Sequence, residues 1–200
     1  MNKKGNKTWV SPIKRQEDIE KILTLLAPSR RNTAIFVTGI NTNLRASDLV
    51  ALRIKDVEHL RAGDPLVNRD QKVSRYVVRA VNKLVTEKLR AWLAEHPDRS
   101  NPEAPLFLSQ RNCALTVPSL SRLVKEWCQA AGLRSGNYAS HSLRKTWAFW
   151  AIEFGVPFYI VSAALGHRDH ETTLTYLGIQ QKAIRDAFMN EIGRVKHGPM

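Results

Sequence analysis

Cysteine, acidic residues and long apolar runs are all scarce in this sequence. The two cysteines, Cys113 and Cys128, lack the spacing of metal ligands, which favours reduced structural thiols over a disulfide framework or a metal site. No apolar run approaches the roughly 20 residues that a membrane-spanning helix requires. The first seven residues are polar and basic, and no apolar stretch follows them as it would in a secretory signal. We therefore expect a cytoplasmic protein that does not insert into membranes.

The shortage of acidic residues leaves a large positive charge. Lysine and arginine number 31 against 18 aspartates and glutamates, so the formal net charge is +13 and the pI is about 10.1. This balance favours a polyanionic partner, with nucleic acid ahead of an anionic membrane surface. The alternative is a basic surface that serves only solubility.

The length and the hydrophobic pattern predict one domain of mainly helical structure. Two short β-type runs, Leu66-Val67 and Tyr76 to Val78, flank a polar stretch and predict a hairpin or small antiparallel sheet. The fold class expected is therefore α+β, mainly helical. Apolar periodicity, with Pro and Gly as stops, predicts helices from Ser11 to before Pro28, through 34–40 and 46–52 with a bend at Asn43, from Asn82 to before Pro97, over 118–131, from a Ser140 cap to Gly155, from Pro157 to Gly166, after Glu171, and over 180–195.

Three short motifs follow one another along the chain. The first, from Thr42 to Leu49, contains Arg45; the second is His141-Ser142-Leu143-Arg144; the third is Leu165-Gly166-His167, followed nine residues later by Tyr176. In order and spacing they resemble the signature boxes of the tyrosine recombinase (phage integrase) family, over roughly residues 16–190.

Two residues depart from the family's usual pattern. Asn43 stands where the family generally has Gly, and Asp48 replaces the commoner Glu. Asn is among the few residues that adopt a positive φ at modest cost, so the bend is expected to persist. Neither departure removes a catalytic group, and an active enzyme is expected.

The resemblance implies a domain plan and a reaction. It implies a basic tail over 1–15, the catalytic-domain fold over 16–179, and a helix over 180–200 that docks on a neighbouring subunit. It also implies a site-specific recombinase or integrase that forms a 3′-phosphotyrosyl intermediate and a Holliday junction in a synaptic tetramer. Double-stranded DNA, further copies of the chain and accessory DNA-bending proteins are the expected partners, and the protein is expected at the nucleoid. Many family members carry an N-terminal helical domain before this match, so we expect a short member or a minimal integrase.

The chemistry of phosphodiester cleavage assigns the catalytic residues. Attack on a phosphodiester adds a second negative charge, and two guanidiniums can clamp its oxygens bidentately; Arg45 and Arg144 are the candidates. The nucleophile expected is Tyr176, which must lose a proton because its reference pKa is about 10. His141, one turn from Arg144, is placed to help accept that proton.

Three further side chains complete the expected site. Lys72, near the tip of the predicted hairpin, is the candidate donor of a proton to the leaving 5′ oxygen, and Arg69 competes for that role. His167 would donate a hydrogen bond to the phosphate, and Asp48 would hold the Arg45 region in place. The scheme needs no metal and no cofactor, and no carboxylate or thiol cluster accompanies His167 and His170 as a metal site would require.

Three other classes of protein stay open at this point. A type IB topoisomerase would use a similar tyrosine but relax supercoils without a specific site. A non-catalytic DNA-binding regulator on the same fold would usually have lost a catalytic residue. An RNA-binding or ribosomal protein would share the charge without needing the ordered boxes.

Overall fold

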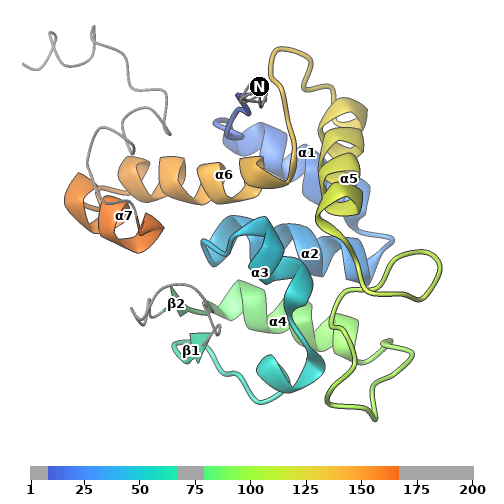
Figure 1. Cartoon of the computed structure of the whole chain (residues 1–200). Helices are drawn as coiled ribbons and strands as arrows, with labels where there is room; N and C mark the ends of the chain where they lie inside the picture. Colours follow the sequence, from blue (N-terminus) through green and yellow to red (C-terminus); the bar gives the residue numbers. More distant parts are fainter. Residues whose placement is uncertain (1–8, 67–78, 167–200) are drawn as a thin grey trace, which may run out of the picture.

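The computed structural model describes residues 9–66 and 79–166, and the expected mainly helical fold with a small antiparallel sheet is confirmed there (Figure 1). The sheet has two short strands, β1 (Pro65–Leu66) and β2 (Arg79–Ala80), paired antiparallel with Leu66 opposite Arg79. The helices are α1 (Gln16–Leu26), α2 (Arg30–Asn41), α3 (Ala46–Ala51), the 3-10 turn η1 (Ile54–Asp56), α4 (Lys83–Leu93), α5 (Val117–Ala130), α6 (Ser140–Glu153) and α7 (Phe158–Leu165). None of the helices within these two stretches has the length and apolarity to cross a bilayer.

Local sequence signals account for several helix ends. The Asn82 side chain accepts a hydrogen bond from the backbone N–H of Val85 at the start of α4, and Thr116 accepts one from Ser119 at the start of α5. Gly166 ends α7 in the left-handed conformation. The expected cap Ser140 is instead the first residue of α6; Ala139 precedes the helix, and its N–H donates to the Ser142 hydroxyl.

Helix α2 forms the centre of the domain. It lies between α4 and α6 and packs against both (Figure 1), and residues 34–39 are buried without interruption. Its Phe36 meets Trp127 of α5 edge to face, with ring centroids 6.2 Å apart. Burial of residues 34–39 on all sides explains why this stretch has no charged face.

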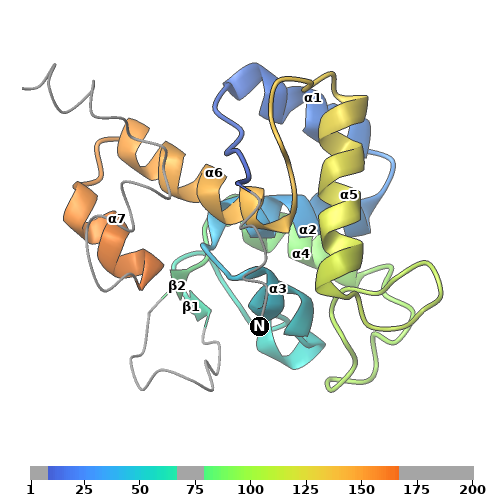
Figure 2. The same cartoon turned by 45° about the horizontal axis from the view of Figure 1, so that its top comes forward.

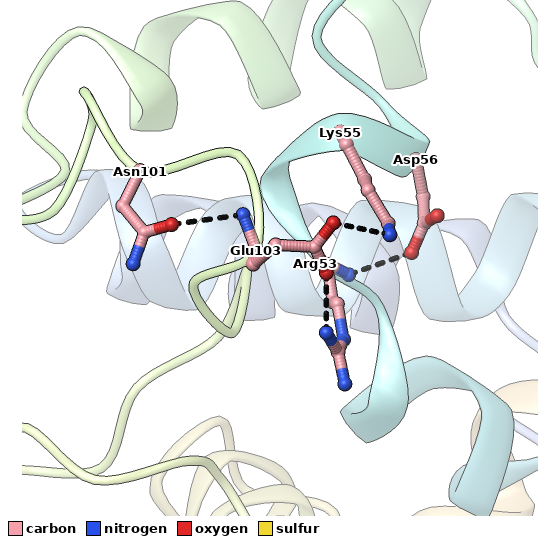
Figure 3. A network of polar contacts seen from close by, with 5 residues as sticks. All are labelled: Arg53, Lys55, Asp56, Asn101 and Glu103. Carbon is pink, nitrogen blue, oxygen red and sulfur yellow. Dashed lines mark hydrogen bonds and ion pairs between the residues drawn. The ribbon is translucent and has the colours of Figure 1, made fainter.

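A polar network fastens the loop after α4 to the turn η1. In Figure 3 the Glu103 carboxylate accepts hydrogen bonds from the side chains of Arg53 and Lys55, and Asp56 accepts one from the backbone of Arg53. The two cations hold the pKa of Glu103 below its ordinary value. All of these side chains except Asp56 are well exposed, and exposed ion pairs add little stability. The backbone hydrogen bonds from Ile54 to Ala104 and from Lys55 to Pro102 therefore matter as much for holding the loop against η1.

The residues before α1 lie across α6 and are hydrogen-bonded to it. Residues 9–13 run beside that helix in the view of Figure 2, and Ile13 is fully buried. The Ile13 N–H donates to the hydroxyl of Thr146 at 2.9 Å, and the Trp150 indole donates to the Ile13 carbonyl at 3.0 Å. Part of the segment that the sequence suggests is a tail therefore belongs to the packed domain.

Helices α2 and α6 approach so closely at Gly39 that a side chain there would collide. A Cβ added to Gly39 would lie 2.6 Å from Cδ1 and 3.1 Å from Cβ of Leu143. We expect Gly39→Ala to lower the free energy of unfolding by about 1–3 kcal/mol, as overpacked cores do, because α6 must shift. Denaturant unfolding measures this effect.

A double-mutant cycle tests the cause of that loss. Leu143→Ala alone leaves a cavity, but combined with Gly39→Ala it removes the collision. The sum of the losses in unfolding free energy of the two single variants should therefore clearly exceed the loss in the double variant. Strict additivity would show that the contact at Gly39 is not the source.

Candidate active site

Arg144 is the centre of the candidate site. It lies in the second turn of α6, only 5% exposed, and its guanidinium reaches two backbone carbonyls. Nη1 donates to Asn43 at 2.9 Å and Nη2 donates to Leu165 at 2.6 Å. These bonds fix the plane of the guanidinium before any substrate arrives and join the three sequence motifs through one side chain.

The bend after α2 brings the first motif to Arg144. Asn43 has a φ of +55°, so the positive φ expected for this residue is confirmed. Its side-chain amide donates to the carbonyl of Ala164 at 2.7 Å, next to the carbonyl that Arg144 uses. The bend is thus tied to the end of α7 as well as to α6.

Arg45 and Asp48 lie at the start of α3. Arg45 is the half-buried residue that precedes the helix, and its carbonyl accepts the backbone N–H of Asp48 at 3.0 Å. The Asp48 carboxylate accepts a hydrogen bond from the Ser47 hydroxyl at 3.3 Å, while its Oδ2 atom is buried without a hydrogen-bond partner. A carboxylate in a first helical turn is stabilised by the N–H groups there.

His141 lies one turn before Arg144 on α6, with an accessible side chain. Its pKa is lowered from the ordinary value, first by partial loss of hydration and then by the positive charges of Arg144 and Lys145. A lowered pKa keeps the imidazole neutral near pH 7, and a neutral imidazole is able to accept a proton.

Four residues of the expected site fall outside the described part of the chain. These are Lys72, its competitor Arg69, His167 and Tyr176, and the expected helices after Glu171 and over 180–195 fall there too. The segment that holds Lys72 connects β1 to β2, and these two described strands pair with each other. The described structure also reaches Gly166, one residue before His167.

The sequence did not point to two residues near this site. Gly39 allows α2 and α6 to approach, as described above. Lys145, the residue after Arg144, is 4% exposed and its ammonium lies 3.3 Å from the ring centroid of Trp9. Its place four residues after His141 was the one available signal, since residues at that spacing share a helix face.

The conformation at Asn43 leads to a testable difference between two substitutions. Asn43→Ala forces a Cβ-bearing residue without a polar side chain into a positive φ and loses the bond to Ala164, so we expect a loss of about 1–3 kcal/mol in stability. Asn43→Gly keeps the conformation accessible and should cost less than half as much. Thermal or denaturant unfolding distinguishes them, and equal losses would mean that the side-chain bond alone matters.

Two known relatives match most of this chain. The probable integrase/recombinase YoeC of Bacillus subtilis is 27% identical over 184 residues, covering 90% of this chain and 95% of YoeC. The tyrosine recombinase XerD of Oceanobacillus iheyensis is 25% identical, covering 88% of this chain but 60% of XerD. The chain thus spans nearly all of one relative and about three fifths of another.

Solved structures show the same fold. The crystal structure of XerA recombinase has a TM-score of 0.74 at 19% identity, over 92% of this chain and 67% of that one. XerH recombinase bound to palindromic difH substrate has a TM-score of 0.68 at 24% identity, over 94% of this chain and 55% of XerH. A family model described as the phage integrase family matches residues 14–182. With that match over most of its length, the chain belongs to the phage integrase family.

Proposed function

We propose that this chain is a site-specific DNA recombinase that cuts and rejoins double-stranded DNA through a covalent link to Tyr176. The observation that supports this most is the position of Arg144, whose guanidinium bonds to the bend of the first motif and to the end of α7, where the third motif begins. Three segments far apart in the sequence meet at one buried cation.

The two arginines would bind the scissile phosphate. A planar guanidinium matches a phosphate edge, and one held by fixed carbonyls loses little conformational freedom on binding. Arg144 is fixed in this way, and Arg45 lies two residues after Asn43, whose carbonyl is one of those anchors. Charge stabilisation of this kind acts most strongly on the pentavalent transition state, which carries the extra negative charge.

The proton transfers follow from the remaining residues. The Tyr176 hydroxyl would lose its proton to His141 while its oxygen bonds to phosphorus. The bond from phosphorus to the 5′ oxygen would break as Lys72 protonates that oxygen, which leaves a 3′-phosphotyrosyl link and a free 5′ hydroxyl. His167 would donate a hydrogen bond to the phosphate, and Asp48 would support the start of α3. Attack by a 5′ hydroxyl from a second duplex reverses the chemistry and yields a Holliday junction.

Strand exchange of this kind requires several copies of the chain. We propose a synaptic tetramer on DNA in which residues 16–179 form the catalytic unit and residues 180–200 dock on a neighbour. The match to a recombinase solved with its DNA substrate supports DNA as the partner, as does the net charge of +13.

The decisive experiment maps the DNA attached to Tyr176 in cells. Covalent complexes are purified under denaturing conditions, and the attached ends are sequenced. We expect one recurring sequence, joined through its 3′ phosphate, with a free 5′ hydroxyl on the other side of the break. Random sequences, together with relaxation of any supercoiled plasmid, would indicate a topoisomerase. Complete absence of attached DNA, with DNA binding retained, would indicate a regulator.

A further inference from the structure

Helix α7 packs mainly on one neighbour, α6. In Figures 1 and 2 it lies at one end of the molecule, beside α6 and away from α1 and α5. Its Val161 and Leu165 are buried with Ala148 and Ala151 of α6 in a small apolar cluster that is separate from the main core. Polar contacts at the end of α7 therefore matter for joining it to the first motif.

Two backbone carbonyls in the last turn of α7 accept hydrogen bonds from side chains of the first and second motifs. Carbonyls in a last helical turn lack partners within their own helix. Here the Ala164 carbonyl accepts the Nδ2 amide of Asn43 at 2.7 Å, and the Leu165 carbonyl accepts Nη2 of Arg144 at 2.6 Å. Gly166 follows directly and ends the helix. The two bonds therefore fix the point from which the chain leaves α7.

The bend at position 43 does not itself require the side chain of Asn43. A glycine adopts a φ of +55° without the steric cost that a Cβ brings. Asn43 is 2% exposed, and its Oδ1 atom is buried with no hydrogen-bond partner among the described residues, so the bond from Nδ2 has to offset a cost of desolvation. The net stability gained from the amide is therefore small. What the side chain adds over a glycine is a direct bond between the bend and α7.

We propose that Asn43 is a positioning residue, whose amide fastens the end of α7 to the bend that carries Arg45, so that the chain continuing from α7 presents Tyr176 to the bound phosphate. The inference rests on the proposed function for the role of Tyr176. The carbonyl of Asn43 also orients Arg144. One residue thus sets the end of α7 relative to both guanidiniums, and a small misplacement of a reacting group slows a reaction steeply.

The test removes the amide donor in two ways and makes a matched change elsewhere. Asn43→Gly deletes the amide and keeps the backbone conformation accessible. Asn43→Asp keeps the size and also tolerates a positive φ, but it places an oxygen where the donor was, so the Ala164 carbonyl loses its partner. Asn112→Gly is the control, because Asn112 has the same φ of +55° and lies exposed in the loop before α5.

Single-turnover cleavage of a nicked duplex separates positioning from binding. At saturating enzyme, the rate of covalent-complex formation should fall about 10–100-fold in Asn43→Gly and at least as far in Asn43→Asp, while the dissociation constant for DNA changes by less than about threefold. Asn112→Gly should react at the wild-type rate. A wild-type rate in Asn43→Gly overturns the proposal, and so does a loss that appears only in Asn43→Asp or only as weaker DNA binding.

Amide hydrogen exchange in the free protein gives a second readout that does not depend on catalysis. Losing one hydrogen bond at the end of α7 should raise the exchange rates of the Leu165 and Gly166 N–H groups by about 5–10-fold in Asn43→Gly, while amides in the middle of α6 exchange as in wild type. Unchanged exchange at α7, or an equal rise in α6 that signals a general loss of stability, overturns the proposal. If exchange rises only at α7 while wild type forms no covalent complex, the proposed function fails and the attachment of α7 by Asn43 stands.

Discussion

Tyr176→Phe is expected to bind its recombination site as tightly as wild type and to form no covalent complex at all. The substitution keeps the aromatic ring and removes only the phenolic oxygen, which is the atom that would bond to phosphorus. On a suicide duplex with a nick beside the scissile phosphate, wild type should accumulate as an adduct that survives denaturation. The loss in the variant should exceed about a thousandfold, since no other group on the ring can replace the nucleophile.

A matched control is available on α7. Tyr159 is 64% exposed, so Tyr159→Phe makes the same chemical change at a surface position and should keep the full adduct yield. Mass spectrometry of the wild-type adduct should place the nucleotide on the peptide that contains Tyr176. An adduct in Tyr176→Phe, or one carried by another residue, would show that the nucleophile has been misassigned.

Most of the helices could be predicted because their limits depend on neighbouring residues. Asn82 caps α4 as its side chain suggests, and Gly132, Gly155 and Gly166 have the positive φ values with which helices often end. Ser140 was misplaced by one residue, since α6 begins at Ser140 and the residue that precedes it, Ala139, has no polar side chain that could cap the helix. Strand β1 includes Pro65, one residue before its β-type run, and β2 includes Arg79 and Ala80, which follow the other run; Val67 and Tyr76 to Val78 lie outside the described residues.

The sequence names candidate residues for the site but does not show how they are connected. The motifs name Arg144, yet no local pattern shows that its donors reach Asn43 and Leu165, since those contacts depend on how α2, α6 and α7 pack. The same holds for Trp9 and Lys145, which meet only because residues 9–13 cross α6. Sequence motifs identify residues that recur in a family, but contacts made through tertiary packing are known only from the structure.

The second large effect is expected when the residue that protonates the leaving 5′ oxygen is replaced. If Lys72 protonates the departing 5′ oxygen, Lys72→Ala should slow cleavage by roughly a hundredfold or more on ordinary DNA, as loss of a general acid does. A substrate whose 5′ bridging oxygen is replaced by sulfur should restore most of that rate, because a thiolate leaves without a proton. The measurement is single-turnover cleavage of the two substrates by each variant.

The arginines provide the contrast that makes this rescue informative. Arg45→Ala and Arg144→Ala should stay slow on both substrates, since their charges stabilise the phosphorane whatever atom departs. Arg45 is the cleaner control, because Arg144→Ala also strips the carbonyls of Asn43 and Leu165 of a buried partner and lowers stability. Arg69→Ala tests the competing residue of the same segment. Rescue of the Arg69 variant alone would transfer the role of proton donor to Arg69, and equal rescue of the Lys72 and Arg45 variants would mean that the sulfur substrate merely reacts faster with any weakened enzyme.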